Sequence, residues 1–95
     1  EGAKGASITY AQKFIDMGAV VIDNGSDFRL KSGVPLVVPE ANGDKIFTHK
    51  GLIANPNCTT IQAIVALSGI YKKLGLRRIL LVSFQATSGA GAKAV

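Results

Sequence analysis

The sequence predicts an α/β fold from three observations. A helical spacing of apolar residues over Thr9–Met17 leads through Gly18 into a short β-branched run, Ala19–Ile22. A second helical pattern covers Thr59–Leu74, and a strongly apolar run, Arg77–Gln85, follows it. Helical patterns that alternate with short apolar strands are typical of a sheet covered by helices.

The composition of the 95 residues excludes several classes of protein. Hydrophobic residues make up 47% and charged residues 18%, which is too apolar for a disordered chain. The single cysteine, Cys58, excludes an internal disulfide framework and a multi-cysteine zinc site, and it fits a reducing intracellular compartment. The longest apolar stretches, 61–71 and 79–86, are far shorter than the ~20 residues that span a bilayer. We therefore expect neither a membrane segment nor a secretory signal.

The two ends of the sequence suggest a fragment. The chain begins at Glu1 rather than at a methionine, and its only methionine is Met17. It stops at Val95, just after a glycine-rich turn at 88–92. This length allows one small domain or pieces of two larger ones.

The first elements are a helix, a strand and a turn. The helix is predicted over Thr9–Met17, with Gly18 as its C-terminal stop. Ala19–Ile22 predicts a buried strand because it is short, β-branched and without alternation. Asp23–Ser26 consists of turn-forming residues. Three apolar residues of the helix are spaced for one face: Tyr10, Phe14 and Met17.

The middle of the chain predicts short extended pieces. The prolines that bracket Pro35–Pro39 favour an edge strand or a strand-like extended segment. Ala41–Asp44 is predicted as a turn, and Ile46–His49 as a short strand after it. Leu52–Ala54 is predicted as another strand, which leads into Asn55-Pro-Asn-Cys58.

The last part predicts a helix followed by a strand. Gly75 ends the helix Thr59–Leu74, and Arg77–Gln85 is the strongest strand pattern in the chain. The apolar residues of the helix predict a buried stripe made of Ile61, Ile64 or Val65, Leu67 or Ser68, and Tyr71. Leu52–Ala54, this helix and Ile79–Gln85 are expected to form one βαβ unit. Because chemistry collects at the carboxyl ends of such strands, we expect Cys58 and Gln85 to meet.

Cys58 is the strongest candidate for chemistry. It lies where the second helix begins, and the positive end of the helix dipole favours a thiolate. Backbone N–H groups there also suit an oxyanion that forms when a thiolate attacks a carbonyl. The alternative is a buried, inert cysteine. His49 is the only histidine and is interpreted as a surface residue, so a catalytic base is expected outside these residues.

Three further features are weaker candidates. Arg29 follows a turn beyond a strand, where its planar fork suits a carboxylate or phosphate; the alternative is a solvated arginine. Gln85 is an amide in an apolar run, which indicates either a ligand contact or a satisfied core or edge glutamine. Gly89 and Gly91 permit close approach to a ligand, although the chain contains no dinucleotide-binding GxGxxG fingerprint.

The net charge of +5 does not predict nucleic-acid binding. A nucleic-acid site would combine a basic face with aromatic residues, and the chain has no Trp. We interpret the basic cluster as a solvated corner, formed by Lys72, Lys73, Arg77 and Arg78.

With these motifs assembled, the chain resembles the aspartate-semialdehyde dehydrogenase family along nearly its whole length. The order and spacing of the motifs make the resemblance specific. The matching stretches are Gly18–Asn24 with Phe28-Arg29, Val34–Glu40 with Asn42, Ile53–Thr59 with Ile61-Gln62, and Gln85-Ala86 with Ser88–Gly91.

The resemblance implies a role for each candidate. Cys58 matches the nucleophile that holds the acyl group as a thioester, and Asn57 matches a residue that helps to position the substrate. Gln85 matches the glutamine that orients substrate at the cysteine, and Arg29 matches an arginine that binds the transferred phosphate. A loop that touches the nicotinamide cofactor is matched by Ser88 and Gly89.

The reaction implied by the resemblance is the NADPH-dependent reductive dephosphorylation of aspartyl phosphate to aspartate semialdehyde. This reaction belongs to the biosynthesis of lysine, threonine, methionine and isoleucine. The implied partners are small molecules, namely aspartyl phosphate, aspartate semialdehyde and phosphate, with neither nucleic acid nor membrane. A cytoplasmic homodimer or homotetramer is implied for the full-length enzyme.

The resemblance divides the chain near Asn55. Residues 1–55 match the C-terminal part of a Rossmann-type NAD(P)-binding domain. Residues 56–95 match the start of an α+β catalytic and dimerisation domain, to whose sheet the final strand would belong. The phosphate-binding Gly-rich turn of the family would lie before Glu1, and its catalytic histidine and a second substrate arginine after Val95. The fragment alone is therefore expected to be inactive.

Two other functions stay open at this point. The sister enzyme N-acetyl-γ-glutamyl-phosphate reductase uses the same thioester chemistry, and Asp27–Leu30 favours it. That family, however, has Asn-Pro-Gly-Cys where this chain has Asn55-Pro-Asn-Cys58, and it lacks the run Val34–Glu40. The second alternative is a non-catalytic binding or structural module.

Overall fold

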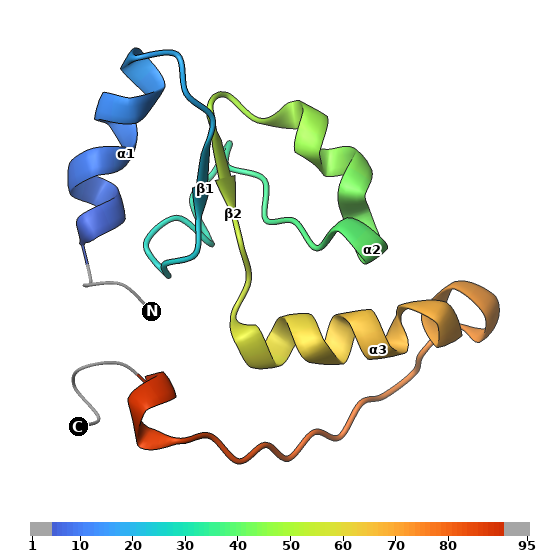
Figure 1. The fold of residues 1–95 in the computed structure, drawn as a ribbon. Helices are drawn as coiled ribbons and strands as arrows, with labels where there is room; N and C mark the ends of the chain where they lie inside the picture. Colours follow the sequence, from blue (N-terminus) through green and yellow to red (C-terminus); the bar gives the residue numbers. More distant parts are fainter. Residues whose placement is uncertain (1–4, 91–95) are drawn as a thin grey trace.

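The computed structural model describes residues 5–90 and has the alternation of helices and strands that defines an α/β fold (Figure 1). No helix in this described range is both long and apolar enough to cross a membrane. In chain order the elements are α1 (Ala6–Asp16), β1 (Val21–Asp23), α2 (Pro39–Asn42), the 3₁₀ helix η1 (Gly43–Thr48), β2 (Leu52–Ala54), α3 (Cys58–Leu74) and the 3₁₀ helix η2 (Thr87–Ala90).

β1 and β2 form a parallel pair, as an α/β fold requires. The register places Val21 opposite Leu52. On its other side β2 pairs with the extended segment between the prolines. Ala54 donates its backbone N–H to the carbonyl of Pro35 at 2.9 Å and accepts from the N–H of Val37 at 3.0 Å. The prediction of a strand-like segment at Pro35–Pro39 is thus confirmed. Because β2 has a neighbour on both sides, all three of its residues are buried.

The core lies between α1 and one face of this sheet. It is formed by four buried residues, Ala11, Phe28, Leu52 and Ala54, with Ile15, Val21, Val34 and Leu36 partly buried around them. The predicted first helix is confirmed, but a different face of it packs. Ala11 and Ile15, one turn apart, point to the sheet. The predicted apolar face stays largely exposed, at 54% for Tyr10, 53% for Phe14 and 80% for Met17.

The prediction of a buried strand at Ala19–Ile22 was wrong in bounds and in burial. The strand runs over Val21–Asp23, and Ile22 is 71% exposed whereas Asp23 is 4% exposed. Successive side chains of a strand point to opposite faces, and α1 covers only the face of Val21 and Asp23. On the opposite face Ile22 of the edge strand β1 stays open, whereas Ile53, its partner in the register, is 6% exposed.

The predicted turn at Ala41–Asp44 and strand at Ile46–His49 were also wrong. These residues belong to α2 and η1, apart from His49, which follows η1. The side chain of Asn42 accepts from the N–H of Val38 at 2.8 Å and donates to the carbonyl of Leu36 at 3.0 Å. These local bonds, together with a proline at the first position of α2, favour helical turns over an extended strand.

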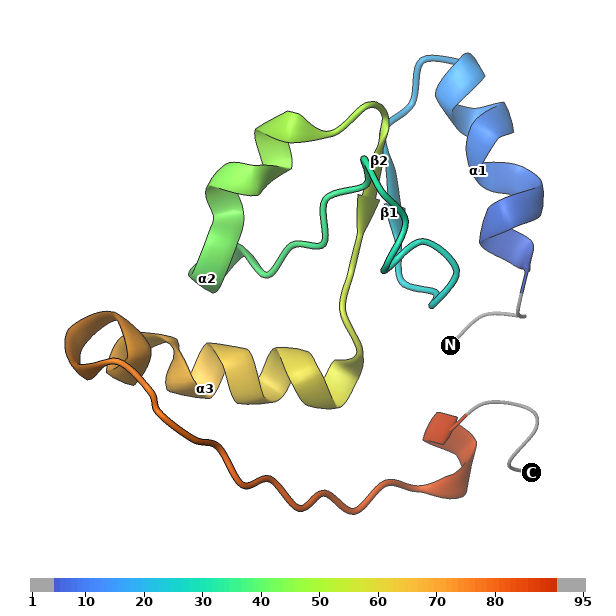
Figure 2. The ribbon, with the colours of Figure 1, turned by 180° about the vertical axis from the view of Figure 1, so that it is seen from behind.

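The strongest strand prediction, Arg77–Gln85, was wrong as well. This segment forms no strand, so the βαβ unit predicted from Leu52–Ala54, the helix and Ile79–Gln85 is absent. A strand needs a neighbour that accepts and donates its ladder bonds, and none of the described residues pairs with this segment. Leu80 and Phe84 are 90% and 98% exposed. In Figure 1 and Figure 2 the segment runs back beside α3, from its end toward its start.

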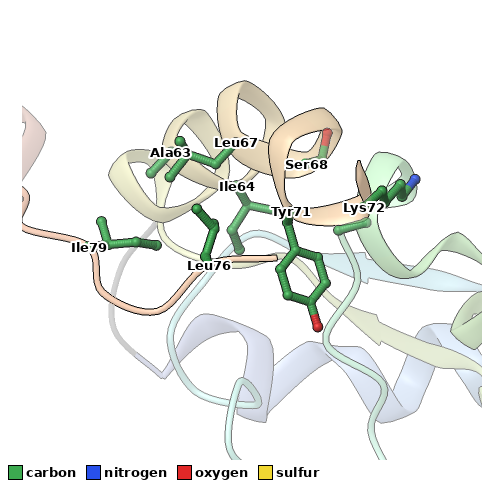
Figure 3. A pocket seen from close by; sticks show the side chains of 9 residues that line it. Ala63, Ile64, Leu67, Ser68, Tyr71, Lys72, Leu76 and Ile79 are labelled. Atoms are coloured by element: carbon green, nitrogen blue, oxygen red, sulfur yellow. The ribbon is translucent and has the colours of Figure 1, made fainter. Parts of the chain in front are cut away.

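Helix α3 confirms the predicted second helix, and it ends at Gly75, whose N–H donates to the carbonyl of Tyr71 at 2.9 Å. The prediction of a buried stripe on this helix was wrong, because no residue of α3 is buried, and Val65 and Tyr71 are 40% and 63% exposed. Much of this stripe lines an open apolar pocket of about 410 Å³ (Figure 3). The other side of this pocket consists only of Ala41 and residues after the helix, Leu76 and Ile79. The basic corner is exposed, as predicted.

Candidate active site

Cys58 and Gln85 lie together, as the sequence predicts, although the βαβ unit expected to bring them together is absent. Nε2 of Gln85 is 3.9 Å from Sγ of Cys58. Cys58 is a free, exposed thiol at the first residue of α3, and Gln85 reaches it because the chain returns along the helix. The same Nε2 donates to the carbonyl of Gly89 at 2.9 Å. An amide that is fixed at both contacts can orient a group bound at the thiol.

Asn57 caps the helix that begins at Cys58. Its Oδ1 accepts from the backbone N–H of Thr59 at 3.0 Å and of Thr60 at 3.4 Å. Asn is among the preferred residues at this position because it satisfies N–H groups that the helix leaves without partners. The cap fixes the first turn of α3 around Cys58 and keeps the thiol at the positive end of the helix dipole.

Arg29 lies at the carboxyl ends of the two strands. Its Nε donates to the carbonyl of Asn55 at 2.9 Å, and its Nη2 donates to the carbonyl of Asn24 at 3.1 Å. The side chain is half-buried, so the alternative of a freely solvated arginine is wrong. The planar guanidinium is thereby oriented at the edge of the sheet from which the Cys58 segment leaves, a position from which it could hold an anion.

Two asparagines at the same place were not singled out as site residues by the sequence. Asn24 directly follows β1 and Asn55 directly follows β2. Nδ2 of Asn55 donates to Oδ1 of Asn24 at 2.7 Å, and the backbone N–H of Asn55 donates to the carbonyl of Asp23 at 2.8 Å. The signal that could have found them is their equivalent position, one residue past the carboxyl end of each parallel strand.

Asp23 is a buried carboxylate beside this edge, and it too was missed. Its Oδ1 accepts from Oγ of Ser7 at 2.5 Å and from the backbone N–H of Gly25 at 2.8 Å. Its Oδ2 is buried without a hydrogen-bond partner in the described residues. Asp27 adds a second carboxylate, whose Oδ2 accepts from the backbone N–H of Gly5 at 3.0 Å. Both carboxylates thus hold the N-terminal end of α1, where negative charge is stabilising.

Ser88 and Gly89 form η2 with Thr87 and Ala90. A Cβ atom on Gly89 would lie 3.1 Å from Nε2 of Gln85, a tight contact that a small shift of the glutamine side chain would relieve. Because Nε2 of Gln85 donates to the carbonyl of Gly89, the structure brings Gly89 to the Cys58–Gln85 pair. Gly91, the second glycine of the predicted close-approach turn, lies outside the described residues.

His49 does not share this location. Its Nδ1 accepts from the backbone N–H of Gly51 at 2.9 Å, just before β2 begins. Cys58 follows the other end of β2, so the strand separates the two residues. This agrees with the interpretation that His49 is not the partner of the thiol.

Comparison with known proteins connects this geometry to one family. Residues 3–49 match the family described as semialdehyde dehydrogenase, NAD binding domain. The chain is 54% identical over 88 residues to aspartate-semialdehyde dehydrogenase of Aquifex aeolicus, covering 90% of this chain and 26% of the relative. It is 50% identical over 78 residues to the enzyme of that name from Prochlorococcus marinus, covering 82% of this chain and 23% of the relative.

Two solved structures are similar as well. One is the crystal structure of aspartate semialdehyde dehydrogenase II from Vibrio cholerae, with a TM-score of 0.83 and 46% identity over 93% of this chain and 27% of that chain. The other is the same enzyme complexed with ASA, with a TM-score of 0.74 and 44% identity over 79% of this chain and 25% of that chain. The chain thus spans about a quarter of the length of the relatives that it matches.

Proposed function

Because this chain belongs to the aspartate-semialdehyde dehydrogenase family, we propose that it forms the nucleophile-bearing part of a longer NADP-dependent enzyme. That enzyme would reduce aspartyl phosphate to aspartate semialdehyde and release phosphate. The chain alone would be inactive, because it spans only about a quarter of its relatives. The observation that supports the proposal most directly is the contact between Gln85 and Cys58 at the start of α3.

The chemistry would begin at the Cys58 thiol. The thiolate attacks the acyl carbon of aspartyl phosphate, the C–O bond to phosphate breaks, and a thioester forms. Gln85 would orient the acyl group at the sulfur, since its amide already touches Sγ. Asn57 would help to position the substrate while it caps α3. Reduction of the thioester leaves a thiohemiacetal, whose collapse releases the aldehyde and returns the thiolate.

Arg29 would bind the phosphate that leaves. Its guanidinium is oriented by carbonyls that follow β1 and β2, and arginine is suited to bidentate recognition of phosphate. A cation there would stabilise the negative charge that develops on the leaving group. No proton-transfer role is assigned to His49, so we expect the general acid and base from another part of the enzyme.

Ser88 and Gly89 would contact the nicotinamide cofactor. One observation supports this placement: Gly89 of η2 lies against the Gln85 amide at the thiol, and its carbonyl accepts from Nε2 of Gln85. When bound, the cofactor supplies the hydride that reduces the thioester. We propose NADP(H) as the form used, because the reaction implied by the family resemblance uses it.

The proposal extends to organisation and setting. Residues 1–55 would be the C-terminal part of a Rossmann-type domain, and residues 56–95 the start of the catalytic and dimerisation domain. The enzyme would be a homodimer or homotetramer in the cytoplasm, where the free, exposed thiol of Cys58 stays reduced. Its partners would be small molecules rather than nucleic acid.

The test is an assay of the full-length protein with two aldehydes, NADP and phosphate. We expect oxidation of aspartate semialdehyde, little oxidation of N-acetylglutamate semialdehyde, and loss of activity in Cys58→Ala. Gln12→Ala, on the exposed side of α1, is the matched control and should retain activity. Preference for the N-acetylated aldehyde would assign the sister reductase instead. Full activity of Cys58→Ala would exclude the thioester mechanism.

A further inference from the structure

The loops that follow β1 and β2 are tied together by three residues. Arg29 donates one N–H to the backbone carbonyl of each asparagine, at 3.1 Å for Asn24 and 2.9 Å for Asn55. The asparagine side chains then join each other, from Nδ2 of Asn55 to Oδ1 of Asn24 at 2.7 Å. We name this last bond the Asn24–Asn55 link. Each asparagine therefore uses its backbone for the arginine and its side chain for the other asparagine.

The link joins two groups that the proposed function uses separately. Arg29 is five residues beyond Asn24, on the loop after β1. Cys58 is three residues beyond Asn55, and the buried Pro56 and the helix cap Asn57 lie between them. Because the chain from Asn55 to Cys58 is short and its residues are held, a displacement of Asn55 is passed to the thiol. Likewise, a displacement of Asn24 moves a carbonyl that orients the guanidinium.

We infer that Asn24 and Asn55 are positioning residues, whose side-chain link sets the placement of Arg29 relative to Cys58. In the reaction the phosphate must lie beside the acyl carbon that the thiol attacks, so the guanidinium and the sulfur must be held at a fixed separation. This inference rests on the proposed function, because it takes Arg29 as the phosphate ligand. Neither asparagine needs to touch the substrate.

The Asn24–Asn55 link can be removed by mutation without removing the backbone carbonyls that bind Arg29. Alanine at either position removes the side-chain bond but keeps the backbone carbonyl that Arg29 uses. The exposed location of the bond also means that its loss leaves no buried polar group without a partner. We therefore expect the variants to fold, with thermal midpoints close to that of the parent protein.

The experiment is a double-mutant cycle in the full-length protein, with Asn24→Ala, Asn55→Ala and the double variant. The aldehyde is oxidised with NADP, and KM is measured for inorganic phosphate and for aspartate semialdehyde. Each single variant should raise KM for phosphate about fivefold, in keeping with the loss of one hydrogen bond, and KM for the aldehyde by less than about twofold. The double variant should resemble the single ones, because both remove the same bond.

Three outcomes would overturn the inference. Additive effects, with an increase of about 25-fold in the double variant, would mean that the asparagines act independently. Equal increases in KM for phosphate and aldehyde would indicate a general structural role. A loss of activity that parallels a large fall in the thermal midpoint would also indicate a general structural role. Gln12→Ala serves as the matched control, since its side-chain bond to Asp16 lies on the exposed side of α1.

A second measurement separates this inference from the proposed function. Inorganic phosphate at Arg29 should change the rate at which iodoacetamide alkylates Cys58, without any aldehyde or NADP. The phosphate concentration for half the effect should rise about fivefold in both single variants. If the parent protein fails to oxidise aspartate semialdehyde but both single variants show this shift relative to it, the proposed function fails and the positioning role stands. If phosphate leaves the alkylation rate of the parent unchanged, the positioning role fails.

Discussion

The amide Nε2 of Gln85 lies 3.9 Å from the Sγ atom of Cys58, although 27 residues separate them in the chain. The contact arises because the segment after α3 runs back along the helix to its first residue (Figure 1). The amide is held in place from the other side by the carbonyl of Gly89. The contact places an amide N–H donor directly beside the sulfur atom, so it has a measurable consequence for the reactivity of Cys58.

We predict a graded fall in the reactivity of Cys58 when Gln85 is changed. Gln85→Ala removes the N–H, and the rate of alkylation by iodoacetamide near neutral pH should fall about two- to fivefold in the full-length protein. Gln85→Glu keeps the shape but places a negative charge beside the sulfur, so the rate should fall further. Mass spectrometry of the alkylated peptide gives the rates. An unchanged rate in Gln85→Glu would mean that the contact does not act on the thiol.

Asn57 allows its capping role to be separated from its proposed substrate role. Asn57→Ala should lower the free energy of unfolding by about 1 kcal/mol, because two N–H groups at the start of α3 lose their acceptor. Asn57→Ser should restore most of this stability, since serine also caps well. Urea denaturation of the full-length protein measures the free energy of unfolding, and kcat with aspartate semialdehyde measures the proposed substrate role. If Asn57→Ser also restores kcat, Asn57 acts only as a cap.

The sequence predicted the helices and the contact between Cys58 and Gln85 better than it predicted most of the strands. Helix α3 and Gly75 follow from local signals, namely apolar periodicity and a C-terminal glycine. The meeting of Cys58 and Gln85 was predicted from topology and occurs, although Gln85 reaches Cys58 on an extended segment rather than on a paired strand. Helical hydrogen bonds lie within one segment, so a helix can be recognised from that segment alone.

The strand at Arg77–Gln85 failed for the opposite reason. Its β-branched and apolar residues favour a position in a sheet. The ladder hydrogen bonds, however, must come from another segment, and none of the described residues supplies them. The Asn24–Asn55 link was not predicted for a similar reason, because it also joins two distant segments. It depends on the register of β1 and β2, which pairs residues 31 positions apart. Local composition contains no information on such a pairing.

Asp23 should be important for stability rather than for chemistry. Asp23→Ala removes a buried carboxylate and leaves the half-buried Ser7 hydroxyl and Gly25 N–H without their acceptor, so the free energy of unfolding should fall by about 2 kcal/mol. Urea denaturation of the full-length protein checks this value. Asp44→Ala is the control, because Asp44 is exposed, and its stability should be close to that of the parent. Equal stability of both variants would contradict the anchoring role of Asp23.

Gly51 tests how tightly α1 packs against the start of β2. Its φ of 93° lies in the left-handed region, and a Cβ there would lie 2.7 Å from Cγ2 of Ile15. Gly33 has a similar φ of 81° but no atom near the position of a Cβ, which makes it a matched control. Gly33→Ala should therefore cost only the backbone strain, about 1–2 kcal/mol.

Gly51→Ala adds a steric clash to that strain. It should lower the free energy of unfolding by about 2–4 kcal/mol, because Ile15 must move away from the core or Gly51 must shift. Gly51 also accepts from the N–H of Val21 at 2.8 Å, so its displacement would disturb the start of the parallel pair. Urea denaturation of both variants in the full-length protein measures the difference. If Gly33→Ala and Gly51→Ala lose the same stability, backbone strain alone accounts for Gly51, and the contact with Ile15 contributes nothing.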